Sequence, residues 1–122
     1  MKIAILSDIH ANLEAFNEVL ADIAKSNVDS SICLGDMIGY GPDPEAVVTK
    51  IRSLEIPTIM GNHELAIVDP RYLEWFNPLA RESIQKTVPM LSRSRAAEVW
   101  MGCWLRFEGR RGVPDPPASH RV

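Results

Sequence analysis

The sequence alternates short apolar runs with stretches of helical periodicity, and this order constrains the fold more than any single residue does. The apolar runs cover residues 2–7, 31–34 and 57–60, and each has the length of a β-strand. Between them, residues 13–26 and 44–54 place apolar side chains three and four positions apart, as one face of an amphipathic helix requires. This βαβαβ order predicts an α/β fold with a mainly parallel sheet, right-handed crossovers and flanking helices.

Local signals sharpen the expected element boundaries. Asn12 is suited to cap the first helix, while Asp43 and Pro44 are a typical cap and first residue for the second. Because a continuous apolar run is typical of a parallel strand, we expect the first strand to be covered on both faces. Weaker patterns predict further helices over residues 65–68, 78–88 and 91–104.

Composition indicates an ordinary globular domain. The 122 residues suffice for one core, and the net charge of −3 gives no general attraction to nucleic acid or anionic lipid. No apolar run approaches the ~20 residues of a membrane span, and the N-terminus enters a strand without a secretion signal. We therefore expect a cytoplasmic protein with no membrane partner, in which Cys33 is a small buried hydrophobe.

The composition changes near residue 93. Residues 1–92 hold 13 acids and 7 bases, whereas residues 93–122 hold three acids and six arginines. Ten of the 21 residues from 102 to 122 are Gly, Pro or Arg. We therefore expect an α/β domain over 1–92, followed by a helix remnant and a tail that is disordered, loosely packed or frame-shifted.

Polar side chains gather where the three apolar runs end. Asp8 and His10 follow the first run, Asp36 follows the second, and Asn62 and His63 follow the third. Because the carboxyl ends of parallel strands meet at one edge of a sheet, we expect these side chains to converge.

The types of donor predict a metal site. In an extended chain Asp8 and His10 would project to the same face, while Ile9 points into the core. The carboxylate of Asp36 has two oxygens with which to bridge two cations, and Asn62 offers a neutral amide oxygen. Oxygen donors mixed with imidazole suit Mn, Fe or Zn rather than Ca.

The same residues predict a reaction. His63 follows Asn62 directly, so it should face away from the ion and meet a substrate phosphate as general acid or charge stabiliser. Two divalent ions ~3.5–4 Å apart would clamp the attacking and leaving oxygens and lower the pKa of bound water. The predicted chemistry is hydrolysis of a phosphoester by metal-activated hydroxide.

Three blocks of the sequence resemble a known family. Residues 7–12 (SDIHAN), 34–42 (LGDMIGYGP) and 61–64 (GNHE) are similar to the first three signature blocks of the calcineurin-like metallophosphoesterase superfamily, in its small prokaryotic phosphodiesterase-like branch. The resemblance covers roughly residues 1–92. It implies the N-terminal half of a metallophosphoesterase sandwich and a phosphoester or nucleotide substrate.

The resemblance also implies residue roles. Asp8 and His10 would bind the first metal, Asp36 would bridge both metals, and Asn62 would bind the second. His63 would assist at the leaving group. The expected cofactors are two divalent ions, Mn first, with Fe, Zn or Ni as alternatives.

The histidines depart from the family pattern. The family supplies further ligands from a lone-His block and a Gly-His-x-His block, whereas this sequence has only His10, His63 and His120, and His120 matches neither block. We therefore expect a truncated or frame-shifted form of a longer enzyme. Two functions stay open, an incomplete phosphoesterase or an inactive fragment that binds a partner or forms a homo-oligomer through an exposed sheet edge.

Several neighbouring residues have more ordinary interpretations. Glu64 is expected to be a first-turn acid that the helix dipole favours, and not a ligand. The segment from Gly39 to Gly41 is equally a turn or a ligand-binding loop. Trp75 and Phe76 are expected to pack in a core or satellite cluster.

Overall fold

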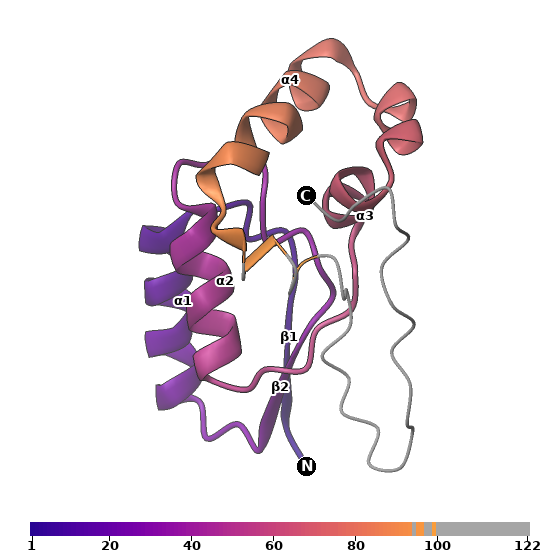
Figure 1. The fold of residues 1–122 in the computed structure, drawn as a ribbon. Coiled ribbons are helices and arrows are strands. Elements are labelled where there is room, and N and C mark those ends of the chain that lie inside the picture. The colour runs from indigo at the N-terminus through magenta and orange to yellow at the C-terminus, as the bar shows by residue number, and fades with distance from the viewer. Residues whose placement is uncertain (94, 97–98, 100–122) are drawn as a thin grey trace.

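The computed structural model describes residues 1–93, 95, 96 and 99. Its element order begins strand, helix, strand, helix, which confirms the α/β class (Figure 1). The elements are β1 (Ile3–Leu6), α1 (Leu13–Lys25), β2 (Ser30–Cys33), α2 (Pro44–Ser53), α3 (Asn62–Val68), η1 (Pro70–Trp75), α4 (Pro78–Thr87) and η2 (Val88–Met90).

The sheet of the described residues has two parallel strands. β1 pairs with β2 in a register that sets Ile3 opposite Ser30 and Leu6 opposite Cys33. The third apolar run lies beside β2 but forms only one parallel bridge, between Cys33 and Thr58. Pro57 has no N–H with which to extend the ladder, so the expected third strand is reduced to this bridge.

Helices α1 and α2 lie on the same side of the two strands (Figure 1). Asn12 caps α1 as predicted, since its Oδ1 accepts a hydrogen bond from the Ala15 N–H at 3.1 Å. Pro44 opens α2, as its position after Asp43 predicted. The core between helices and sheet contains, among others, Leu6, Phe16, Cys33, Val47, Val48 and Ile51.

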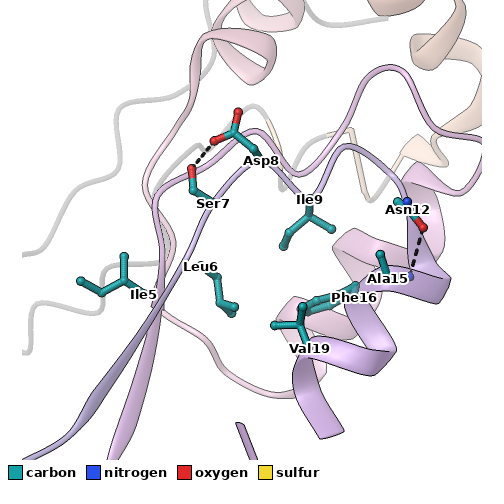
Figure 2. A pocket seen from close by; sticks show the side chains of 9 residues that line it. All are labelled: Ile5, Leu6, Ser7, Asp8, Ile9, Asn12, Ala15, Phe16 and Val19. Carbon is teal, nitrogen blue, oxygen red and sulfur yellow. Dashed lines mark hydrogen bonds between the residues drawn. The ribbon is translucent and has the colours of Figure 1, made fainter. Parts of the chain in front are cut away.

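The opposite face of β1 is open, which corrects the expectation of a strand covered on both faces. Ile3 is 45% exposed and Ile5 is 65% exposed, whereas Leu6 is 7% exposed. Figure 2 shows Leu6 on the side of α1 and Ile5 directed away from that helix. The alternation of side chains along a strand thus places one set in the core and leaves the other set exposed.

The elements after the third apolar run lie where β1 and β2 finish (Figure 1). The helix expected over 65–68 begins earlier, at Asn62, and the helix expected over 78–88 is α4 followed by η2. The helix expected over 91–104 and the tail over 93–122 lie mostly outside the described residues. None of the described helices has the length and apolar character to cross a membrane.

Candidate metal centre

Three of the predicted ligands converge at the ends of β1 and β2. One ligand atom from each of Asp8, His10 and Asp36 lies within 4.8 Å of the other two. His10 Nε2 is 3.3 Å from Asp8 Oδ1. The side chain of Asp8 is exposed, whereas His10 and Asp36 are half-buried. The cluster is therefore open to solvent on the side of Asp8.

The backbone brings these side chains together by a different route from the one expected. Asp8, His10 and Asp36 have φ values of 56°, 47° and 54°, in the left-handed region rather than in extended conformation. Such values are uncommon for residues other than glycine and concentrate at functional sites. Ile9 still packs against the core, as predicted. The convergence was predicted correctly, but simple strand alternation does not cause it.

Main-chain hydrogen bonds hold the first loop, residues 8–11, against the second loop, residues 35–38. The bonds run from Asp8 N to Gly35 O (3.3 Å), from His10 N to Asp36 O (2.9 Å) and from Ala11 N to Met37 O (2.7 Å). They continue the pairing of β1 with β2 beyond the strand ends. The relative position of the two loops therefore follows from the sheet itself.

A contact with the second loop orients the His10 ring. Its Nδ1 lies 2.9 Å from the carbonyl oxygen of Ile38. Because a carbonyl only accepts, Nδ1 carries the hydrogen, so Nε2 on the side of Asp8 is the nitrogen that could donate an electron pair to a cation. A histidine held through its other nitrogen in this way is typical of metal ligands.

Asp8 is also held in its charged form. Ser7 Oγ donates to Asp8 Oδ2 at 2.6 Å, a bond drawn in Figure 2. This hydrogen bond, together with the neighbouring His10, keeps the pKa of Asp8 below its usual value, although loss of water acts to raise it. An ionised carboxylate beside an imidazole nitrogen and a second carboxylate fits a divalent cation.

The third loop, residues 61–64, lies directly against Asp36. A Cβ on Gly61 would be 2.3 Å from Asp36 Oδ1, so no larger residue fits there without movement. The same Oδ1 accepts a hydrogen bond from the His63 N–H at 3.0 Å. Asn62 is exposed at the first position of α3, between these two residues. Its role as a ligand remains a prediction.

His63 is buried beside the cluster. Its ring centroid lies 4.6 Å from that of His10, 5.0 Å from that of Tyr40 and 5.2 Å from that of Phe76. Burial lowers the pKa of His63, the neighbouring His10 lowers it further, and Asp36 and Asp8 act in the opposite direction. Within the described part of the chain, its buried Nδ1 has no hydrogen-bond partner.

Gly39, which directly follows the second loop, packs against the His63 ring. Gly39 has a φ of +83°, and a Cβ on it would lie 2.3 Å from His63 Nδ1. Only glycine combines this backbone conformation with this close contact. The ring of His63 is therefore held in one place by Gly39 and by the aromatic residues around it.

Tyr40 is a site residue that the sequence left open. It is exposed, and its ring centroid lies 5.0 Å from that of His10 and 5.0 Å from that of His63. Its backbone is left-handed, with a φ of 60°, and its N–H donates to Ser83 Oγ of α4 at 2.5 Å. These contacts favour a ligand-facing loop over a simple turn.

One of the ordinary interpretations is incomplete and another needs correction. Glu64 lies in the first turn of α3 as predicted, but it is 1% exposed and also accepts hydrogen bonds from main-chain N–H groups of both the second and the third loop. Trp75 is 80% exposed and meets the edge of Tyr72, so only Phe76 packs as expected. A glutamate at the third position of a helix does predict a capping bond, but only to the residue before the helix.

Two known proteins align with more than half of this chain. The chain is 44% identical over 75 residues to the uncharacterized protein MJ0912 of Methanocaldococcus jannaschii, an alignment covering 62% of this chain and 31% of the relative. It is 29% identical over 111 residues to the symmetrical bis(5'-nucleosyl)-tetraphosphatase of an Acidovorax species, covering 88% of this chain and 37% of the relative.

A solved structure agrees with the fold. The crystal structure of a metallophosphoesterase from Sphaerobacter thermophilus superimposes with a TM-score of 0.62 and 38% sequence identity, covering 81% of this chain and 40% of that one. The chain spans about a third of the length of the curated relatives it matches.

One protein family matches most of the chain. The profile of the calcineurin-like phosphoesterases matches residues 1–107, a segment that includes all three loops of the centre. The chain belongs to the calcineurin-like phosphoesterase family.

Proposed function

We propose that this chain carries part of the active site of a metal-dependent phosphoesterase, within the unit of residues 1–92. The observation that supports this most directly is the cluster of Asp8, His10 and Asp36 within 4.8 Å. Asp8 and His10 would hold the first divalent ion, Asp36 would be shared by two ions, and Asn62 would hold the second.

The donor set fits such ions. Two carboxylates and one oriented imidazole suit Mn, Fe, Zn or Ni, and we propose Mn first. When bound, the ions supply positive charge to phosphate oxygens and lower the pKa of coordinated water. Each ion would take about 4–6 ligands, so water, or donors outside the described residues, must complete the two sites.

The residues around the cluster serve the substrate. His63, fixed by Gly39 and by Phe76, is suited to donate a hydrogen bond or a proton to a phosphate or leaving-group oxygen. The exposed ring of Tyr40 offers an apolar surface beside the cluster. Together with the relative named as a bis(5'-nucleosyl)-tetraphosphatase, these features support a nucleotide or another small phosphoester as substrate. The cytoplasm is the location we propose for this reaction.

One observation favours a second candidate, an inactive fragment that acts by association. Ile3, Ile5, Leu34 and Ile59 are each at least 40% exposed. An open apolar face beside an unpaired strand edge favours pairing with another chain, including a second copy of this one. Under this alternative the cluster of Asp8, His10 and Asp36 would be the remnant of an active site that no longer functions.

Metal stoichiometry separates the two candidates. The full chain is stripped with EDTA and titrated with Mn by calorimetry, and hydrolysis of bis(p-nitrophenyl) phosphate is followed. The proposed function predicts two Mn ions per chain and metal-dependent turnover. One weak ion or none, with no turnover, would favour the inactive fragment.

A variant of His63 tests its role. We expect His63→Ala to bind Mn with unchanged stoichiometry and to lose about 10²–10⁴-fold in turnover, the range of a general acid. Gln85→Ala, an exposed change on α4, is the control and should retain full turnover. A thermal melt of each variant shows whether it is folded. Turnover of folded His63→Ala equal to that of the control would remove His63 from the mechanism.

A further inference from the structure

Glu64 receives more hydrogen bonds than its position in α3 explains. Its Oε1 accepts from Met37 N at 2.7 Å and from Ile38 N at 3.3 Å. Its Oε2 accepts from Asp36 N at 2.7 Å and from Gly61 N at 2.9 Å. The side chain is 1% exposed. One carboxylate therefore binds main-chain groups of two loops that are more than 20 residues apart in the sequence.

Three of these four bonds lie outside ordinary helix capping. A glutamate at the third helical position caps its own helix by accepting from the residue before it, which here is Gly61. The remaining bonds go to the second loop, which carries the ligand Asp36. Glu64 thus connects the second loop with the third loop, which carries Asn62 and His63.

The two loops are in direct contact at this point. A Cβ on Gly35 would lie 2.2 Å from Gly61 N, and Gly35 has a φ of +93°. A Cβ on Gly61 would lie 2.5 Å from Asp36 N. The loops therefore approach so closely that neither Gly35 nor Gly61 could carry a side chain there. The Glu64 carboxylate lies next to this contact, because it accepts from Asp36 N and Gly61 N.

Burial of this carboxylate is unfavourable unless the loops stay together. Loss of water raises the pKa of Glu64, while the hydrogen bonds from Asp36, Gly61 and Met37 act to lower it. Separating the loops would leave the buried oxygens without partners, which is more costly than never forming the bonds. Glu64 therefore opposes any movement of one loop relative to the other.

We propose that Glu64 is a positioning residue of the metal centre, because its carboxylate fixes the second loop against the third and so sets the spacing of Asp36, Asn62 and His63. Glu64 ligates no metal and contacts no substrate in this proposal. The inference rests on the proposed function for its catalytic meaning, but the connection between the loops is a separate claim with its own measurement.

Glu64→Gln is a sharp test, because both oxygens of Glu64 accept hydrogen bonds from N–H groups. Whichever way the amide is turned, its NH₂ group faces two N–H donors, and two of the four bonds are lost. We expect Mn affinity, measured by calorimetry, to fall about 10–100-fold, as is usual when a residue that holds metal ligands is changed.

Glu45→Gln is the matched control. Glu45 of α2 is also a carboxylate that joins distant segments, since it accepts from Ser92 N at 2.8 Å and from Ser92 Oγ at 2.9 Å. It lies outside the three loops. We expect Glu45→Gln to lower the melting temperature while Mn affinity stays within twofold of wild type. Equal Mn affinities for the two variants would overturn the positioning role.

Amide hydrogen exchange tests the connection without metal. In the metal-free wild-type chain, the N–H groups of Asp36, Met37, Ile38 and Gly61 should exchange slowly, and in Glu64→Gln protection should fall at both loops together. Fast exchange at these amides in wild type, or unchanged protection in the variant, would overturn the proposal. If Glu64→Gln does not fold, Glu64→Asp replaces it, since its shorter side chain cannot reach both loops.

These measurements distinguish the two possible failures. A wild-type chain that binds no Mn refutes the proposed function, and the amide exchange still decides whether Glu64 connects the loops. A chain that binds Mn equally well with and without the Glu64 carboxylate refutes only the positioning role.

Discussion

The centre has two junctions between loops, and they are built differently. The first loop, residues 8–11, meets the second loop, residues 35–38, mainly through main-chain hydrogen bonds, with one side-chain contact from His10 Nδ1 to Ile38 O. The third loop, residues 61–64, meets the second through two carboxylates, because Asp36 accepts from His63 N and Glu64 accepts from both loops. The first junction depends mainly on the backbone, and the second depends on two particular carboxylate side chains.

The sheet explains the difference. β1 pairs with β2 over four residues, and the ladder continues into the first junction. The third apolar run has only the bridge at Thr58, and the chain then turns into α3. Since no ladder reaches the second junction, side chains must supply its bonds. We therefore expect single substitutions to disrupt the second junction more than the first.

The largest effect should come from Asp36→Ala, which removes the proposed shared ligand and one of the two carboxylates of the second junction. We expect Mn affinity to fall more than about 100-fold, beyond the range for residues that only hold ligands in place. Calorimetry measures the affinity, and hydrogen exchange at the His63 amide reports the junction. Asp8→Ala is the counterpart, because it removes a proposed ligand but should leave that amide protected. Equal exchange in the two variants would contradict the comparison.

An intermediate effect is expected from Gly61→Ala, which forces the two loops apart. The new methyl group would lie 2.3 Å from Asp36 Oδ1, and overpacking of this kind costs about 1–3 kcal/mol of unfolding free energy. Denaturant unfolding measures the loss, which should be accompanied by weaker Mn binding.

Gly41→Ala is the matched control for that change. Its methyl group would lie 2.3 Å from the carbonyl oxygen of His10, so it crowds the first loop instead. Protection of the Gly61 and His63 amides should be lost only in Gly61→Ala. Loss of that protection in both variants would mean that the two junctions open as one unit.

The smallest effect is expected from Ser7→Ala. This change removes the hydrogen bond to Asp8 Oδ2 but no bond of either junction. The pKa of Asp8 should rise toward its ordinary value, which is still far below neutral, so Asp8 stays ionised. A Mn titration at neutral pH should therefore show a change of less than about 0.5 kcal/mol in binding free energy, as for most surface substitutions. A tenfold loss would show that Ser7 orients Asp8.

Features that depend on neighbouring residues were predictable from the sequence. Asn12 caps α1, Pro44 opens α2, and the alternation of strands and helices places Asp8, His10 and Asp36 at one edge. Each of these follows from patterns within a few residues, combined with the geometry of parallel sheets. The clustering of these three side chains was therefore predicted, although the left-handed conformation of their backbone was not.

Features that depend on distant residues were not predictable. Glu64 looks like an ordinary first-turn acid, because three of its hydrogen-bond donors lie 26–28 positions earlier in the chain. The exposure of Ile5 also had no local signal, since an apolar run does not indicate whether one face or both faces are covered. The roles of such residues depend on how the loops pack against one another.

Cys33 gives the chain an internal chemical reporter. Its main-chain N–H donates a hydrogen bond to Pro57 O, and its carbonyl oxygen accepts one from Ile59 N. The residue is 1% exposed. Burial raises the pKa of this thiol, so it should resist alkylating reagents while β2 and the third apolar run stay paired. The rate at which a reagent labels Cys33 would therefore record how often the protein separates these two segments in solution.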